Sequence, residues 1–374
     1  MKYGILTLPL WNNYGGILQS YALKKTLNDQ CVDTILINLH RPYPSTYKEI
    51  EKKLKRIIKK KFFSNSIVYP TIKESQYISE VTLQFVENEL SPKTEVLTSN
   101  SDLLSISSFI DGVIVGSDQV WRPNYTPNIY NYFLDFLPNN KKKISYAASF
   151  GTDKWLFTEE ETDKCKSLLK KFDSISVREK SAINLVEQKL GKSAEFVLDP
   201  TFLLEKRDYI DLINKYSEEL SDGNLFTYIL DRNKGIDNLI DKISQALELK
   251  PFEVMPKSFD VNFNFDDKSY CFPSVTKWLR AFLDSDFVIA DSFHGCVFSI
   301  IFNKPFIAIG NKERGLSRFY SLLETFDLQE RLILDLDKFD MSILSKEIDW
   351  KGVNKIRDAL KEKSIDFIKS SIYD

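Results

Sequence analysis

The sequence predicts an α/β protein made of two units, each built around a parallel β-sheet. Short apolar strands alternate with helices along most of the chain, which is the pattern of βαβ units. The strands are rich in β-branched and aromatic residues, as in parallel sheets that are covered on both faces. The alternation runs in two series that separate near residues 199–206, and 374 residues suffice for two domains of about 150 residues each. We therefore expect domains at 1–203 and 204–350, followed by a C-terminal segment, 351–374.

The first unit begins with a strand, a loop and a helix. The apolar segment Tyr3–Leu8 predicts the strand, and Ile17–Leu27 has apolar side chains at helical spacing. The next strand, Thr34–Asn38, completes a βαβ unit, which implies parallel strands and a right-handed crossover. Four further strands are expected in this unit: Gly112–Val115, Ile144–Ala148, Ser174–Val177 and Phe196–Leu198.

The second unit repeats the alternation. Its expected strands are Leu225–Leu230, Phe252–Met255, Phe287–Ala290, Phe306–Ile309 and Leu332–Leu334. Its expected helices are Ile236–Leu249, Thr276–Leu283 and Gly295–Phe302. The terminal stretch Val353–Ile372 also has a helical apolar pattern, and we expect it to pack back on the first unit.

An insertion at residues 41–108 interrupts the first unit and contains a strongly basic helix. Apolar residues recur at helical spacing within 48–63. Eight basic residues stand there against two acidic ones, a net charge of +6 in a chain whose net charge is −2. Two interpretations are open: a solvated basic helix, or a helix attracted to anionic lipid headgroups or to a pyrophosphate.

Composition excludes several functional classes. A net charge of −2 gives no overall attraction to nucleic acid, so no such partner is expected. No apolar run approaches the ~20 residues of a membrane span, and the N-terminus lacks the features of a signal peptide. Four well-separated cysteines form no CxxC pair, and only two histidines are present, without HExxH. We expect a cytoplasmic protein without a metal site, with 48–63 as a contact to the inner face of the membrane.

Ligands in open α/β sheets bind beyond the carboxyl ends of the strands, where each strand meets the following loop. The first of these junctions, after the strand Tyr3–Leu8, is rich in glycine. Glycine lets the backbone approach a ligand closely, although a tight strand-to-helix turn would need the same residues. The candidate acceptor-binding residues at this junction are Asn13, Tyr14, Gly15 and Gly16.

The second junction holds Asp118 and Trp121, just after the strand Gly112–Val115. An aspartate at this place could bind sugar hydroxyls or act as a base, and a tryptophan could stack on a sugar ring. The alternative is a helix-capping Asp118 or Ser117 with Trp121 in the core.

The third and fourth junctions carry a cation and a histidine. Arg178 ends a strand, where its guanidinium could hold a carboxylate or phosphate in a bidentate manner, or pair with Glu179 at the surface. His294 follows the strand Phe287–Ala290 and lies in or just before the first turn of a helix. Helix N-termini attract anions, and histidine exchanges protons near neutral pH. We therefore expect His294 to act in the site.

These junctions, in this order, resemble the polysaccharide pyruvyl transferase family over residues 3–345. The resemblance implies a GT-B-like fold, in which two Rossmann-like domains with parallel sheets face a cleft. It also implies transfer of a carboxyvinyl-derived group from phosphoenolpyruvate to a sugar, forming a pyruvate ketal and releasing phosphate. The segments that carry it are GILTLPLWNNYGGILQSYAL, DGVIVGSDQVW, YAASFG, SVRE, VLDPTFLL and DSFHGCVFSIIFNKPFIAIGN.

The resemblance assigns roles to individual residues. His294 matches the family's essential histidine and is the candidate proton donor, and Arg178 matches an arginine that holds phosphoenolpyruvate. Many members have Arg-Leu-His where this chain has Ser292-Phe293-His294. The expected donor site therefore includes Ser292, Phe293 and helix amides. The cations that could replace the missing arginine are Lys304, Arg314 and Arg318.

On this interpretation the acceptor is a sugar of a polysaccharide or of its lipid-linked precursor. Asp118 is the candidate base, and Trp121 joins the glycine-rich loop in acceptor binding. No cofactor is expected beyond phosphoenolpyruvate as the donor substrate. Two alternatives stay open: a GT-B glycosyltransferase that uses a nucleotide sugar, and a glycan-binding protein without catalysis.

Overall fold

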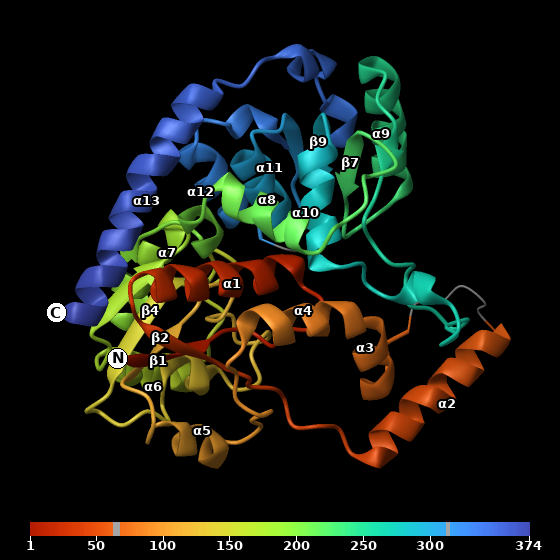
Figure 1. Ribbon diagram of the computed structural model, residues 1–374. Coiled ribbons are helices and arrows are strands. Elements are labelled where there is room, and N and C mark those ends of the chain that lie inside the picture. The colour runs from red at the N-terminus through yellow and green to blue at the C-terminus, as the bar shows by residue number, and fades with distance from the viewer. Residues whose placement is uncertain (63–67, 312–314) are drawn as a thin grey trace.

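The computed structural model describes residues 1–62, 68–311 and 315–374. It contains two β-sheets in which every strand pair is parallel (Figure 1). The first sheet has the strand order β2-β1-β3-β4-β5-β6. Its strands are β1 (Lys2–Leu6), β2 (Asp33–Ile37), β3 (Gly112–Val115), β4 (Lys142–Ala148), β5 (Ser174–Val177) and β6 (Glu195–Phe196).

The second sheet has the strand order β11-β10-β9-β7-β8. Its strands are β7 (Leu225–Tyr228), β8 (Pro251–Phe252), β9 (Phe287–Ala290), β10 (Phe306–Ile309) and β11 (Leu332–Ile333). The predicted fold class, α/β with two parallel sheets, is therefore confirmed. The domain limits near residues 203 and 350 stay a prediction.

Helices connect the strands and cover the sheets. The helices are α1 (Tyr14–Asp29), α2 (Thr46–Phe62), α3 (Ile72–Ile78), α4 (Glu80–Leu90), α5 (Asn100–Ile106), α6 (Glu159–Leu169), α7 (Lys180–Leu185), α8 (Lys206–Lys215), α9 (Lys234–Leu247), α10 (Val275–Asp284), α11 (Phe293–Phe302), α12 (Ser317–Thr325) and α13 (Trp350–Tyr373). Short turns of helix lie between them: η1 (Ile129–Phe133), η2 (Val186–Leu190), η3 (Pro200–Leu203), η4 (Lys268–Tyr270), η5 (Gln329–Arg331), η6 (Leu336–Lys338) and η7 (Met341–Ser345).

Helix α1 begins three residues earlier than its apolar pattern predicts. Asn13 caps it by accepting a hydrogen bond from the Gly16 amide, so both glycines belong to the first turn and not to a loop. The first residue of α1, Tyr14, is fully buried. The glycine-rich segment therefore brings a helix N-terminus to the carboxyl edge of the first sheet.

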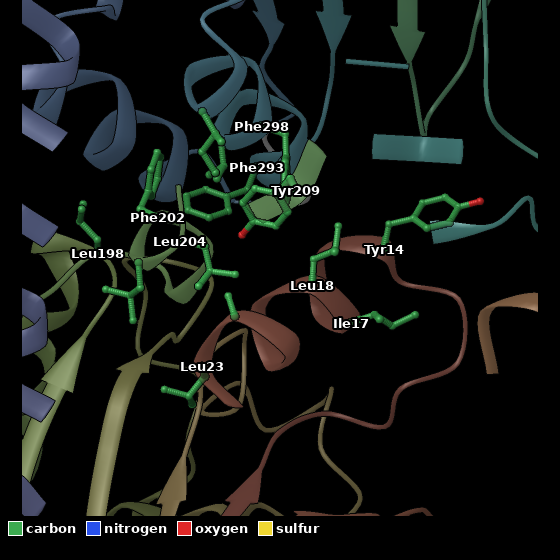
Figure 2. Close-up of a cluster of buried hydrophobic side chains, with 14 of the residues drawn as sticks. Tyr14, Ile17, Leu18, Leu23, Leu198, Phe202, Leu204, Tyr209, Phe293 and Phe298 are labelled. Carbon is green, nitrogen blue, oxygen red and sulfur yellow. The ribbon is translucent and has the colours of Figure 1, made fainter. Parts of the chain in front are cut away.

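One hydrophobic cluster joins the two sheets (Figure 2). Leu18 and Leu23 of α1 lie in the same cluster as Tyr209 of α8 and Phe298 of α11. Tyr14 stacks on Trp278 of α10, with ring centroids 5.4 Å apart. Because burial of these side chains involves both sheets at once, the two halves are held in a defined orientation.

The last helix, α13, runs along the outside of the molecule (Figure 1). Its Ser364 hydroxyl accepts a hydrogen bond from the Leu198 amide at 3.0 Å, and its Phe367 packs against Tyr146 of β4. In the described part of the chain, no helix is both long enough and apolar enough to cross a membrane.

Candidate active site

A cavity of about 320 Å³ lies between the two sheets. The first sheet contributes loops that follow β1 and β3, and the second contributes loops that follow β7 and β9. These are the carboxyl ends of the strands in both halves, where open α/β sheets bind ligands. The residues that line it are Asn12, Asn13, Gly15, Asp118, Gln119, Tyr125, Tyr228, Leu230, Met255, Phe272, Asp291, Ser292, Phe293, His294, Arg318 and Phe319.

His294 is the second residue of α11 and lies in the wall of this cavity. Ser292 caps the helix by accepting a hydrogen bond from the Gly295 amide at 3.0 Å. The imidazole Nε2 is buried and lies 3.5 Å from Oδ2 of Asp199, at ion-pair distance but without a hydrogen bond. The side chain retains only 10% of its exposure. A histidine at a helix N-terminus thus faces a carboxylate from the other half of the chain.

Gly15 makes room for this histidine. A Cβ atom at Gly15 would lie 2.0 Å from Nδ1 and 2.2 Å from Cγ of His294. No side chain fits there unless the imidazole moves. The glycine at the start of α1 therefore serves the close approach of two helix N-termini, one from each half.

Asp199 connects the histidine to the first sheet. Its Oδ1 accepts hydrogen bonds from the Thr201 amide and hydroxyl, and its Oδ2 accepts one from Arg178 Nη1 at 2.8 Å. Burial acts to raise the pKa of this carboxyl, but the neighbouring His294 and Arg178 side chains outweigh it and hold the pKa well below its usual range. Asp199 is therefore a negative charge that its own hydrogen bonds fix beside the imidazole.

Asp199 is a site residue that the sequence reasoning missed. In the sequence, residues 199–206 predict only the boundary between the two units, and VLDPTFLL only supports the resemblance to the family. Asp199 follows β6 at the carboxyl edge of the first sheet, and that position is the signal that could have found it.

Arg178 holds a cluster of carboxylates together. In addition to Asp199, its guanidinium lies 3.7 Å from Asp118 Oδ1 and 3.8 Å from Glu179 Oε2, and its side chain is 1% exposed. The ring of Phe293 lies 4.3 Å from the guanidinium carbon. Arg178 does not line the cavity, so this structure does not place its guanidinium where it could contact a donor bound there. Its position is that of a residue that fixes Asp199 and Asp118.

Arg318, unlike Arg178, lines the cavity. Its guanidinium carbon lies 5.9 Å from the centroid of the Phe293 ring. Burial, and then the positive charge of Arg178, lower the pKa of Arg318 to about 10. An anion in the cavity would offset both effects, so the electrostatics favour anion binding beside Arg318.

The two other candidate cations are not placed at the cavity. Lys304 lies two residues beyond Phe302, the last residue of α11, which is about 12 Å along the helix axis from His294. Its ammonium donates a hydrogen bond to the Ser285 carbonyl. Arg314 lies outside the described residues. Among the described residues, Arg318 is the only lysine or arginine that lines the cavity.

Asp118 lines the cavity opposite α11. Its Oδ1 accepts a hydrogen bond from the Gln119 amide at 2.9 Å, and its Oδ2 accepts one from the Asn13 side chain at 3.2 Å. The backbone at Asp118 is left-handed, with φ of 67°, which the local hydrogen bonds of an aspartate help to support. Asn13 therefore both caps α1 and positions Asp118.

Three candidate acceptor-binding residues are not among those that line the cavity. Trp121 is fully buried, stacks on Phe133 and donates its indole N–H to the Tyr132 carbonyl. It belongs to the core, which is the alternative that the sequence left open. The Tyr14 hydroxyl donates to the Pro273 carbonyl and so links the two halves. Gly16 lies in the capped first turn of α1.

Asp291, which the sequence reasoning quoted but did not select, also lines the cavity. Its two carboxylate oxygens accept hydrogen bonds at 2.8 Å from the amides of Leu230 and Asp231. The carboxylate thus fixes the loop after β7 at the cavity wall. Its place directly after β9 is the same strand-end signal that identified His294. Among the described residues, no group of histidine, cysteine, aspartate or glutamate is arranged to hold a metal ion.

Comparison with solved structures finds matches over nearly the whole chain. UGT89C1 of Arabidopsis thaliana with UDP-L-rhamnose matches with a TM-score of 0.51 and 10% identity, over 98% of this chain and 98% of that chain. MnaA of S. aureus with UDP matches with a TM-score of 0.47 and 13% identity, over 98% of this chain and 95% of that chain. The likeness to the first of these confirms the expected GT-B-like fold, and at this identity it concerns the fold alone.

Comparison with curated proteins gives no match. A family model described as polysaccharide pyruvyl transferase matches residues 13–313. The match starts at the residue that caps α1 and spans Asp118, Asp199 and His294, so it includes both walls of the cavity. The chain therefore belongs to the polysaccharide pyruvyl transferase family.

Proposed function

We propose that this protein transfers a carboxyvinyl-derived group from phosphoenolpyruvate to a sugar of a polysaccharide, or of its lipid-linked precursor, and forms a pyruvate ketal. The observation that carries the proposal is the placement of His294. It lies at a helix N-terminus, in a cavity between the two sheets, with a carboxylate 3.5 Å from its Nε2. That arrangement suits a proton donor beside an anionic substrate.

The donor binds at the side of the cavity formed by the second sheet. Phosphoenolpyruvate has a carboxylate and a phosphate, and Arg318 with the first amides of α11 supplies the matching positive potential. Ser292 replaces the arginine found in many family members, and its hydroxyl already accepts from Gly295 as a helix cap. Arg318 therefore takes over the charge of the missing arginine. Arg178 acts as a positioning residue behind Phe293.

The reaction uses one proton at carbon and two acceptor hydroxyls. Asp199 lies on the Nε2 side of His294, and Nδ1 faces Gly15, itself part of the cavity wall. The imidazolium gives a proton to the methylene carbon, so that C2 becomes an electrophile. One acceptor oxygen bonds to C2, the bond from C2 to the phosphate oxygen breaks, and the second acceptor oxygen closes the ketal. One hydroxyl proton restores the imidazolium and the other leaves with phosphate.

The acceptor occupies the side formed by the first sheet. Asp118 accepts the proton of one acceptor hydroxyl and passes it to the departing phosphate, and the Asn13 side chain donates a hydrogen bond to its carboxylate at 3.2 Å. Asn12 and Tyr125 line the same side of the cavity and offer further polar groups for a sugar. Tyr125 supplies the aromatic ring on this side of the cavity, and Trp121 does not, because it is buried in the core.

The test is conversion of phosphoenolpyruvate and a lipid-linked glycan extract by the purified protein, followed by mass spectrometry of the glycan and measurement of free phosphate. We expect a mass increase equal to pyruvic acid less one water, with one phosphate released per ketal. His294→Gln should lower the rate by about 10²–10⁴-fold, the usual contribution of a positioned acid. His40→Gln is the matched control, because His40 lies outside the cavity and bonds to Asn38.

Three results would contradict the proposal. The first is release of nucleotide from a nucleotide sugar without use of phosphoenolpyruvate, which would indicate a glycosyltransferase. The second is binding of glycan without any turnover, as in a glycan-binding protein. The third is a His294→Gln variant as active as His40→Gln, which would remove the histidine from the chemistry.

A further inference from the structure

Helix α2 is attached to the molecule through its polar side. Glu49 accepts a hydrogen bond from the Ile72 amide at 3.0 Å, and Arg56 donates to Glu74, a buried carboxylate, at 2.6 Å. Lys52 donates to a backbone carbonyl just before α3. These three residues recur every three or four positions, so they share one side of the helix. That side faces the rest of the protein.

The opposite side of α2 is apolar and exposed. We call Tyr47, Ile50, Leu54, Ile57 and Ile58 the apolar stripe. Each of these side chains is between 52% and 76% exposed. At 100° per residue, the stripe lies about half a turn away from the attached side. No residue of α2 is buried, and the helix projects from the body of the molecule (Figure 1).

This orientation is the reverse of the usual one. An amphipathic helix of a globular protein buries its apolar side and exposes its polar side. Here the polar side forms the contacts to the protein, and the apolar stripe is left to water, which is unfavourable. A contiguous exposed apolar surface of this kind marks an interaction site. The occupant of the stripe is therefore something other than the body of this chain.

The charge of α2 selects that occupant. The helix has eight basic and two acidic residues, a net charge of +6. By their positions, Lys53 and Lys60 border the stripe along one edge, and Lys61 lies within it. A second copy of the same helix would bring two strongly positive surfaces together. An amphipathic helix with a lysine-rich border instead matches an anionic bilayer surface. We propose that α2 docks the protein on anionic lipid, with the apolar stripe inserted at the level of the headgroups.

The docking helix also contacts a segment that reaches the cavity. Residues 256–271 join Met255 to Phe272, and both of these residues line the cavity. Phe259 of that segment lies 5.9 Å from the guanidinium carbon of Arg56 on α2 and accepts a hydrogen bond from the Val68 amide. Lipid bound at α2 is thus linked through one short segment to the edge of the cavity. The inference does not depend on the chemistry proposed above, because its test measures binding alone.

The first experiment separates charge from general adsorption. The purified protein is sedimented with vesicles of phosphatidylcholine alone, or with phosphatidylglycerol added, at low salt. We expect sedimentation with the anionic vesicles only, and loss of binding in 1 M salt, where the Debye length is about 3 Å. Lys53→Glu, Lys60→Glu and Lys61→Glu combined should weaken binding at least ~100-fold, at about fivefold per lysine.

A matched control carries the same charge change on α13, which lies on the opposite side of the molecule from α2 (Figure 1). This variant should bind like the wild type within about threefold. Its substitutions replace exposed lysines by glutamate at Lys351, Lys355 and Lys363.

The second experiment tests insertion of the apolar stripe. Ile50→Gln, Leu54→Gln and Ile57→Gln together keep every charge and remove only exposed apolar surface, so the thermal unfolding midpoint should not change. Binding should fall at least ~10-fold, whereas Leu104→Gln with Leu220→Gln, at exposed sites elsewhere, should have no effect. In a separate variant, Leu54→Trp, the new tryptophan should fluoresce, and lipids with brominated acyl chains should quench this fluorescence when the protein is bound to vesicles.

Several outcomes would overturn the inference. Wild-type protein that stays in solution with anionic vesicles would do so at once. Equal losses in the α2 and α13 lysine variants would reduce the effect to net charge. Unchanged binding of the glutamine variant, or no quenching of Leu54→Trp, would refute insertion. A dimer in sedimentation velocity that the glutamine variant abolishes, without lipid binding, would make the stripe a contact between copies of the chain.

Discussion

Replacing Gly15 by alanine should displace the imidazole of the proposed catalytic residue His294 without changing the imidazole group itself. An added Cβ would lie 2.0 Å from Nδ1 of His294, and ordinary contact begins at 3.4 Å. The edge of the imidazole must therefore retreat by about 1.4 Å. Because a displacement of about 1 Å in an active site costs roughly 10²-fold, we expect kcat/KM to fall about 100-fold. This corresponds to about 2.7 kcal/mol of transition-state stabilisation.

Stability should change far less than activity. Gly15 is the second residue of α1, and alanine favours helix over glycine by up to about 1 kcal/mol. Crowding against the imidazole costs about 1–3 kcal/mol and offsets that gain. Gly235→Ala is the matched control, since Gly235 is the second residue of α9 and its Cβ would meet atoms only at 3.2 Å and beyond. That variant should keep full activity.

The assay is the initial rate of phosphate release from phosphoenolpyruvate with the acceptor present, combined with thermal unfolding of each variant. If Gly15→Ala acts through the histidine, adding it to His294→Gln should lower the rate by less than about twofold, since the two changes remove one function. Activity of Gly15→Ala within threefold of Gly235→Ala would refute the reasoning. So would a full additional loss in the double variant.

Three further predictions follow from the charged cluster around the cavity. The pKa of Asp199 is lower in the folded protein than in the unfolded chain, so its contribution to stability is complete above the unfolded pKa of about 4 and is lost as the pH falls below that value. In urea unfolding, the free energy of unfolding of the wild type should therefore exceed that of Asp199→Asn by less and less below about pH 4. A difference that stays constant with pH would contradict this. Arg178→Met leaves the carboxylates of Asp118, Glu179 and Asp199 without their shared cation. It should lower the free energy of unfolding in urea by about 3–5 kcal/mol. A loss under about 1 kcal/mol would mean that Arg178 does not organise these carboxylates. Arg318→Met should leave the free energy of unfolding nearly unchanged, because burial already disfavours the guanidinium charge. The KM for phosphoenolpyruvate should nevertheless rise about 10–100-fold. An unchanged KM in steady-state kinetics would mean that Arg318 does not bind the donor.

Local patterns in the sequence were sufficient for the sheets and for several residues that line the cavity, His294 among them. The strand and helix periods lie within short segments, so the alternation around His294 predicted a strand followed by a helix start, and α11 begins at Phe293. Simple helix geometry would also have argued against Lys304, since the helix from His294 to Phe302 already spans about 12 Å and Lys304 lies beyond it. The same local reasoning found the basic helix at 48–63, which the structure describes as Thr46–Phe62; Phe63 lies outside the described residues.

Contacts between distant residues could not be obtained in this way. Trp121 has the same neighbours in sequence whether it faces a sugar or the core. Only its contacts with η1 and with the segment that follows β4 decide that it is buried. The outward direction of the apolar stripe on α2 likewise depends on the ion pair between Arg56 and Glu74, which no helical period encodes.

By itself, the sequence determined the two parallel sheets, the family, and a histidine at the start of a helix, because strand and helix patterns and ordered motifs are properties of short segments. Only the tertiary structure decided that Asp199 meets His294 and that Gly15 lies against its ring. These three residues lie in segments far apart in the chain and meet only where the two halves pack together. The physical reason is that burial of the shared core fixes how the two sheets face each other, and that orientation, not any local preference, brings their strand ends to one cavity.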